Sequence, residues 1–130
     1  MQKINFKKEM NGKFEEVVVS LTEELKTEGF GILNRIDLHK KFQEKLGKKV
    51  APVTILGACN PKLAYEVYLA NPDVASLLPC NAVIRDIGQG KISVELAKPT
   101  ALMEMLGDSK LVEAAREADL CLSRVLERMH

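Results

Sequence analysis

The residues best suited to chemistry are concentrated in two short, similar segments. Residues 56–61 read Leu-Gly-Ala-Cys-Asn-Pro, and residues 78–81 read Leu-Pro-Cys-Asn. Cys59 stands directly before a predicted helix, because Asn60 is a favoured N-cap residue and Pro61 suits the first helical position. A helix start presents free N–H groups and the positive end of the helix dipole, which attract anions and lower the pKa of a nearby thiol. The pattern therefore indicates a reactive or ligand-contacting Cys59, with Cys80 as the candidate neighbour.

Three classes of function fit these segments. The first, which we favour, is a small-molecule or anion-binding module with its site at the strand-to-helix turn. The second is a thiol-redox or thiol-transfer protein in which Cys59 is the nucleophile and Cys80 the resolving cysteine. The third is a structural or interaction domain with a homodimer interface, in which both cysteines are buried packing residues, the commonest role of free cysteine. The candidate ligand-binding residues are Gly57, Cys59, Asn60, Pro61, Cys80 and Asn81.

The redox hypothesis depends on how the two cysteines are placed. A disulfide requires Cα atoms no more than about 7 Å apart. If the strand that ends near Cys59 and the strand that follows Cys80 run parallel, the two thiols lie at opposite edges of the sheet. That arrangement would count against the redox hypothesis.

The other residues with chemical potential suggest no further site. The only histidines, His39 and His130, lack metal-ligand spacing, and no C-x-x-C pair is present. Residues 88–90, Gly-Gln-Gly, are typical of a hairpin turn rather than a nucleotide-binding loop. Cys121 falls on the apolar stripe of the last predicted helix, so we expect it in the core. We therefore expect no metal ligands and no cofactor, and no catalytic residue can be assigned.

Composition indicates one globular domain over residues 1–130. The chain is 46% hydrophobic and 28% charged, with a net charge of +1, which argues against nucleic acid as a partner. The Lys-rich residues 40–49 are interpreted as a solvated helix face. No apolar run is long enough for a signal peptide or a membrane span. Three cysteines without an export signal predict reduced thiols and a cytoplasmic protein without membrane contact.

The hydrophobic periodicity predicts strands alternating with helices. Helical spacing covers residues 13–28 and 38–46 and recurs after Asn60, after Asn71, from Thr100 to Gly107 and after Asp108. Residues 50–58 are apolar on both alternating faces, which predicts a central strand covered on both sides. These elements predict an α+β, two-layer fold with a mixed sheet of about five strands and helices mainly on one face. The expected strands are residues 2–8, 30–36, 50–58, 81–87 and 91–96.

Two motifs give the chain a specific resemblance. Residues 54–64 and 77–81 closely resemble the family called domain of unknown function 302, and residues 28–33, 36–37 and 42–47 match its pattern too. The resemblance implies a small two-layer α/β fold that is often dimeric, and it implies no activity, because none is established for the family. The positions that match the family's motif are Gly57, Cys59, Asn60, Pro61, Leu78, Pro79 and Cys80.

Overall fold

The structure is a computed structural model that describes residues 3–130. The strand expected from Gln2 is described from Asn5 onward, and Gln2 itself lies outside the described residues. In chain order the elements are β1 (Asn5–Asn11), α1 (Phe14–Thr27), β2 (Gly31–Asp37), α2 (Leu38–Leu46), β3 (Val53–Cys59), α3 (Pro61–Ala70), the 3₁₀ helix η1 (Pro72–Leu77), β4 (Cys80–Gly88), β5 (Lys91–Ala97), α4 (Pro99–Glu104) and α5 (Ser109–Arg128).

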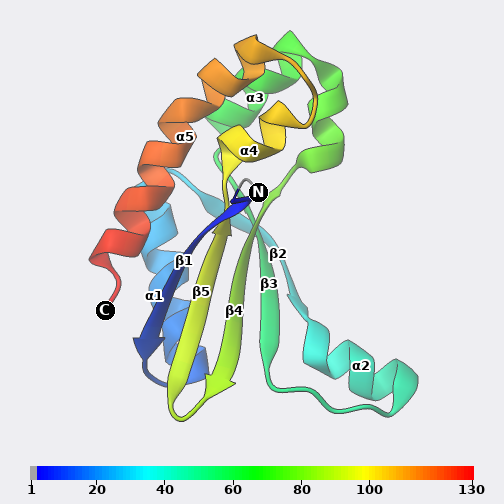
Figure 1. Cartoon of the computed structure of the whole chain (residues 1–130), viewed down its shortest axis with the longest axis vertical. Helices are drawn as coiled ribbons and strands as arrows, with labels where there is room; N and C mark the ends of the chain where they lie inside the picture. Colours follow the sequence, from blue (N-terminus) through cyan, green and yellow to red (C-terminus); the bar gives the residue numbers. More distant parts are fainter. Residues whose placement is uncertain (1–2) are drawn as a thin grey trace.

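The five strands form one sheet in the order β1-β5-β4-β3-β2. The expected α+β class, with five strands and helices on one face, is confirmed (Figure 1). The expected mixture of parallel and antiparallel pairs is not found, since all four pairings are antiparallel. The reason is local connectivity: β4 and β5 form a hairpin, and the connection through α3 and η1 leaves β3 and enters β4 at the same edge of the sheet.

The main core lies between the sheet and the helices α1 and α5. Alternate strand residues point toward these helices, as the two-residue period of a strand requires. Figure 1 shows α1 behind the sheet, whereas the face toward the viewer carries no helix. Cys121 is buried in this core, as its place on the α5 stripe predicted. The fully buried side chains that meet there include Leu21, Leu25, Ile84, Val94 and Val125.

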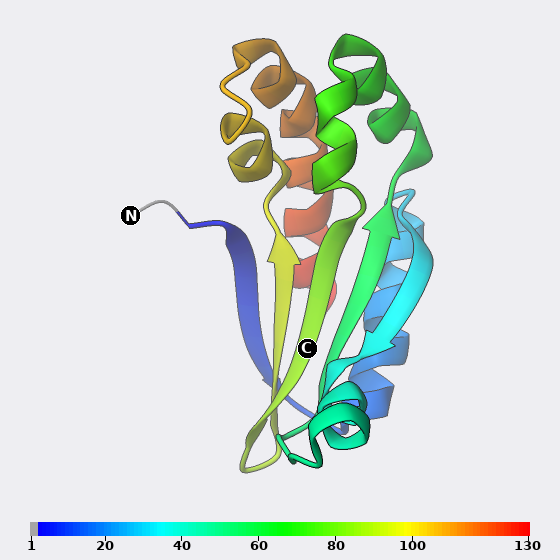
Figure 2. The same ribbon diagram turned by 90° about the vertical axis from the view of Figure 1, so that its right-hand side faces the viewer.

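A second, smaller core lies beyond one end of the strands. There α3, η1 and α4 pack against the first half of α5, around Val74 and Leu111, both fully buried. Figure 2 shows these helices gathered past the strand ends. The 20 residues of α5 span about 30 Å at 1.5 Å per residue. One helix therefore joins both cores, and the space between them lies at the end of β3 and the beginning of β4.

The uncovered sheet face differs from our expectation for residues 50–58. We predicted a strand covered on both sides, but Val53 and Ile55 are only half-buried on the helix-free face. Ile55 instead pairs laterally with Ile36 on β2 and Val83 on β4, so its apolar neighbours lie within the same layer. Periodicity alone cannot distinguish these two environments, because both favour an uninterrupted apolar strand.

Helix α2 projects from the sheet beside β3 (Figure 1) and contains no buried residue. Its exposed lysines agree with the predicted solvated face. Asp37, at its N-cap position, makes no capping hydrogen bond and instead accepts one from the Thr54 hydroxyl at 2.7 Å. In the part of the chain that the structure describes, no helix is both long and apolar enough to cross a membrane.

Candidate functional site

Cys59 and Cys80 lie at the same edge of the sheet. Cys59 ends β3 and Cys80 begins β4, and the register places Cys80 opposite Ala58. The parallel arrangement considered above is therefore wrong, because the two strands are antiparallel. Consecutive strand residues point to opposite faces, so the ladder directs Cys80 to the side of Ala58 and Cys59 to the side of Gly57. The pair is close in the backbone but poorly oriented for a disulfide, and both thiols are free.

A small, partly open cavity lies at the junction of the two cores. Its volume is about 40 Å³, enough for one or a few water-sized groups. The end of the sheet contributes Ala58 and Cys80, α3 contributes Leu63, α4 contributes Met103 and α5 contributes Ala115. The site is therefore built by elements from both halves of the chain. Of the six candidate site residues, three border the cavity: Cys59, Asn60 and Cys80.

Asn60 uses its polar atoms to hold the start of α3. Its side-chain oxygen accepts a hydrogen bond from the Leu63 N–H at 3.3 Å, and its amide donates to the Glu28 carbonyl at 3.4 Å. Its carbonyl accepts from the Ala64 N–H at 2.9 Å, and Pro61 has no N–H to offer. The helix start is thus already largely satisfied by the chain, which weakens it as an anion site.

The electrostatics at the cavity favour neutral thiols. Burial raises the pKa of Cys59. Burial, followed by the nearby Cys59 and Asp119 groups, raises the pKa of Cys80 to about 11. Among the described residues, no lysine, arginine or histidine borders the cavity. The direction for Cys59 is opposite to the lowering of the pKa that a helix start favours, because burial disfavours the charged thiolate. Among residues 3–130, no three His, Cys, Asp or Glu side chains cluster as metal ligands.

The remaining candidates lie outside the cavity. A Cβ at Gly57 would overlap the side-chain oxygen of Asn34 and lie 2.8 Å from Cγ of Pro79, so this position requires glycine for close packing. Pro61 is exposed at the first position of α3. Asn81 is exposed opposite Gly57 and borders a separate surface hollow. Gly57 and Pro61 belong to the strand-to-helix turn and Asn81 lies at the surface of β4, so none of the three lines the cavity.

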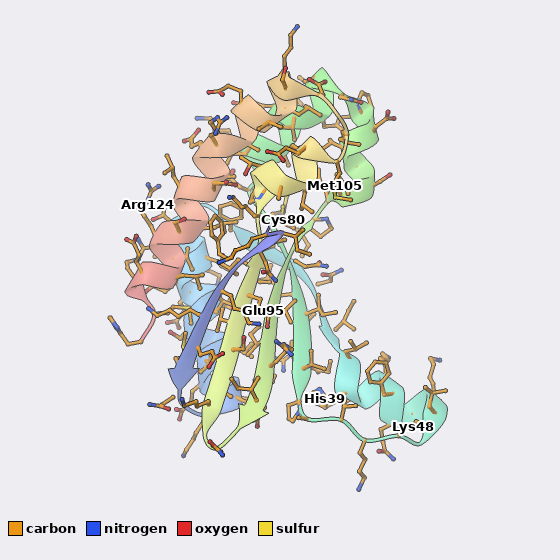
Figure 3. The ribbon with its side chains drawn as sticks, viewed as in Figure 1. His39, Lys48, Cys80, Glu95, Met105 and Arg124 are labelled. Atoms are coloured by element: carbon orange, nitrogen blue, oxygen red, sulfur yellow. The ribbon has the colours of Figure 1, made fainter. Side chains whose placement is uncertain are left out.

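Helix α4, which sequence reasoning did not include in the site, closes the cavity on one side. Asp119 on α5 holds its first turn by accepting hydrogen bonds from the Thr100 N–H at 3.0 Å and the Thr100 hydroxyl at 2.6 Å. Figure 3 shows Cys80 at the strand ends, next to α4. One sequence signal was available: on α5, the residues that line the cavity are the small Ala114, Ala115 and Ala118, where a larger side chain would fill the space.

Comparisons with known proteins agree with the sequence resemblance. The family model described as "Domain of unknown function DUF302" matches residues 6–129. A search of curated proteins found no match. A solved structure, the crystal structure of an uncharacterized conserved DUF302 protein from Bacillus stearothermophilus, matches with a TM-score of 0.92 and 32% sequence identity, covering 99% of this chain and 100% of that chain. The chain therefore belongs to the DUF302 family.

Proposed function

We propose that this protein is a binding module for a small ligand that carries no negative charge, and that the cavity between the two cores is its site. The observation that supports this proposal is the chemistry of the walls. They combine aliphatic side chains from both cores with two neutral thiols, and no cationic side chain is among them.

The same walls argue against the anion that the sequence pattern suggested. Moving an anion out of water without a compensating partner is strongly unfavourable. At the start of α3, the amide of Leu63 is bonded to Asn60 and position 61 is a proline, so few backbone donors remain for an anion. An apolar ligand, in contrast, gains about 25 cal/mol for each Å² of apolar surface that it buries.

The proposal predicts binding of a small apolar probe, such as xenon, that disappears when the cavity is filled. We would record methyl-resolved NMR spectra while titrating xenon and, separately, inorganic phosphate. Ala64→Leu places a larger side chain at the cavity wall, whereas Ala70→Leu makes the same change at the exposed end of the same helix. Xenon should shift methyl signals around the cavity in the unmodified protein and in Ala70→Leu, and not in Ala64→Leu. Saturable phosphate binding at Asn60, without xenon binding, would contradict the proposal.

The thiol-redox alternative receives less support from this geometry. Neither thiol has a base beside it among the cavity residues, and burial favours the protonated form of both. The ladder also directs the two side chains to opposite faces of the sheet.

A second candidate function, self-association, is favoured by the helix-free surface. Helix α2 has no buried residue, and a nine-residue helix is marginally stable without packing. Beside it the open sheet face carries an apolar row of Ile36, Ile55 and Val83. In a two-fold symmetric dimer, the apolar stripe of α2 from each copy can pack against the apolar sheet face of the other copy. We therefore propose that a second copy of this chain covers this face.

Self-association can be tested with two leucines of similar exposure. Leu46, on the apolar stripe of α2, is 65% exposed, and Leu120, on α5, is 61% exposed. The unmodified protein and Leu120→Lys should sediment as dimers, whereas Leu46→Lys should shift toward the monomer, because a charge would be buried in the interface. Analytical ultracentrifugation across a concentration series measures this. A monomeric unmodified protein, or dimers of equal strength in both variants, would exclude this interface.

A further inference from the structure

Three sulfur-containing side chains border the cavity at the junction of the two cores. They belong to Cys59 and Cys80 at the strand ends and to Met103 on α4. The chain has three cysteines and five methionines, and three of these eight residues thus meet around one cavity of about 40 Å³. Thiolate and thioether sulfurs are soft ligands, which favour soft cations such as Cu(I). The walls therefore offer the ligand type of a soft-metal site.

Cys80 and Met103 are the two sulfur-bearing residues best placed to act together. The ladder directs Cys80 to the side of the buried Ala58, and Cys59 to the opposite side of the sheet. Cys80 lies next to α4 (Figure 3), the helix that carries Met103. Met103 is buried in the second core and borders the cavity, and a methionine side chain is flexible enough to adjust to a ligand. The cavity therefore brings a thiol and a thioether to one small space.

The charge balance at this pair favours a monovalent cation. Such an ion replaces the proton of the Cys80 thiol: a sulfur–metal bond forms, and one proton passes to solvent. The Met103 thioether donates a lone pair and loses no proton. The site is uncharged before and after this exchange, which suits apolar walls. Zn²⁺ would leave a net positive charge and needs three or four protein ligands, yet no histidine, aspartate or glutamate of residues 3–130 borders the cavity.

We propose that the cavity binds one monovalent soft cation, with Cu(I) as the biological candidate, between the Cys80 thiolate and the Met103 thioether. The inference rests on the proposed function, because it names a ligand class for that site. The ion reaches the site from the open side of the cavity, where Leu63, Ala64 and Ala114 are only half-buried. Cys59 stays protonated beside the bound ion and is not a ligand.

Silver nitrate in a chloride-free buffer supplies Ag(I), a soft monovalent probe that needs no reductant. We would label the methionine methyl groups with carbon-13 and follow a titration by NMR. The first equivalent of Ag(I) should shift the Met103 methyl signal. It should leave the signal of Met105, which is 69% exposed and is not among the cavity residues. An unshifted Met103 signal would overturn the proposal, even if Ag(I) binds elsewhere.

Two matched pairs of variants assign the ligands. Met103→Leu, which nearly conserves the side-chain volume, and Cys80→Ser should each weaken Ag(I) binding about tenfold or more, measured in competition with a chelator. Met105→Leu and Cys59→Ser should leave the affinity within about twofold. Equal weakening by Cys59→Ser and Cys80→Ser, with no weakening by Met103→Leu, would indicate a site made of two thiolates and overturn the proposal.

Xenon binding separates this inference from the proposed function. Met103→Leu keeps an apolar side chain of similar volume at the wall, so this variant should still bind xenon while it loses Ag(I) affinity. Xenon in the cavity without an Ag(I)-induced shift of the Met103 signal keeps the function and rejects the metal site. A shift of the Met103 signal by Ag(I) without xenon binding keeps the metal site and rejects the binding of apolar ligands there.

Discussion

Gly57→Ala should lower the free energy of unfolding by about 1–3 kcal/mol, the range typical of overpacking a well-packed site. A Cβ at Gly57 would collide with the Asn34 side chain on β2 and with the ring of Pro79. Asn34 is exposed and can rotate away, but the Pro79 ring cannot move without shifting the backbone between Leu78 and Cys80. Chemical denaturation followed by circular dichroism measures the change.

Two further variants identify the cause of this loss. Gly31→Ala makes the same substitution in the neighbouring strand, where a Cβ would meet nothing within 4 Å, and should change stability by less than about 0.5 kcal/mol. Asn34→Ala combined with Gly57→Ala should keep most of the loss, because the Pro79 contact remains. Equal stability of Gly57→Ala and Gly31→Ala would show that close packing is not the reason for glycine at position 57.

At pH 7 the Cys80 thiol should react with an alkylating reagent about 100-fold more slowly in the folded protein than in urea. This difference should remain when the reagent can reach the thiol, because it comes from the thiolate fraction. The pKa of Cys80 rises from an ordinary 9.0 to about 11 on folding, and two pKa units reduce the thiolate fraction about 100-fold. The rate should keep increasing up to about pH 11. A plateau near pH 7 would instead reveal a stabilised thiolate and revive the redox hypothesis.

The same shift predicts how stability depends on pH. The folded state keeps the Cys80 proton to a higher pH than the unfolded state does, so this contribution to stability is fully present below about pH 9. It is lost progressively as the pH rises through about 11, because the unfolded chain then releases the proton first. Cys80→Ser should remove this part of the pH dependence, whereas Cys121→Ser should leave it in place.

Local signals were sufficient for most of the fold. Asn60 and Pro61 fixed the start of α3 as predicted, and the Asn60 side chain makes the expected capping bond. Gly47 ends α2 in a left-handed conformation, and residues 88–90 form the hairpin turn between β4 and β5. Each of these features depends on residues adjacent in sequence, which is why the pattern alone reveals them.

Strand order and the cavity depended on contacts between distant residues. Cys59 and Cys80 share one sheet edge only because β3 and β4 are antiparallel, a fact that neither motif contains. The cavity also needs Met103 and Ala115, far from both motifs in sequence. The sequence shows the helix start beside Cys59 but not the apolar walls that desolvate both thiols and raise their pKa values.

The most direct test of the central claim is a crystal structure of the protein under xenon pressure. We expect a xenon atom in the space between Leu63, Met103 and Ala115, beside Cys80, and no xenon there in Ala64→Leu. Xenon bound elsewhere with this cavity empty, or a cavity filled by ordered water that xenon does not displace, would contradict a binding site for an uncharged ligand at the junction of the two cores.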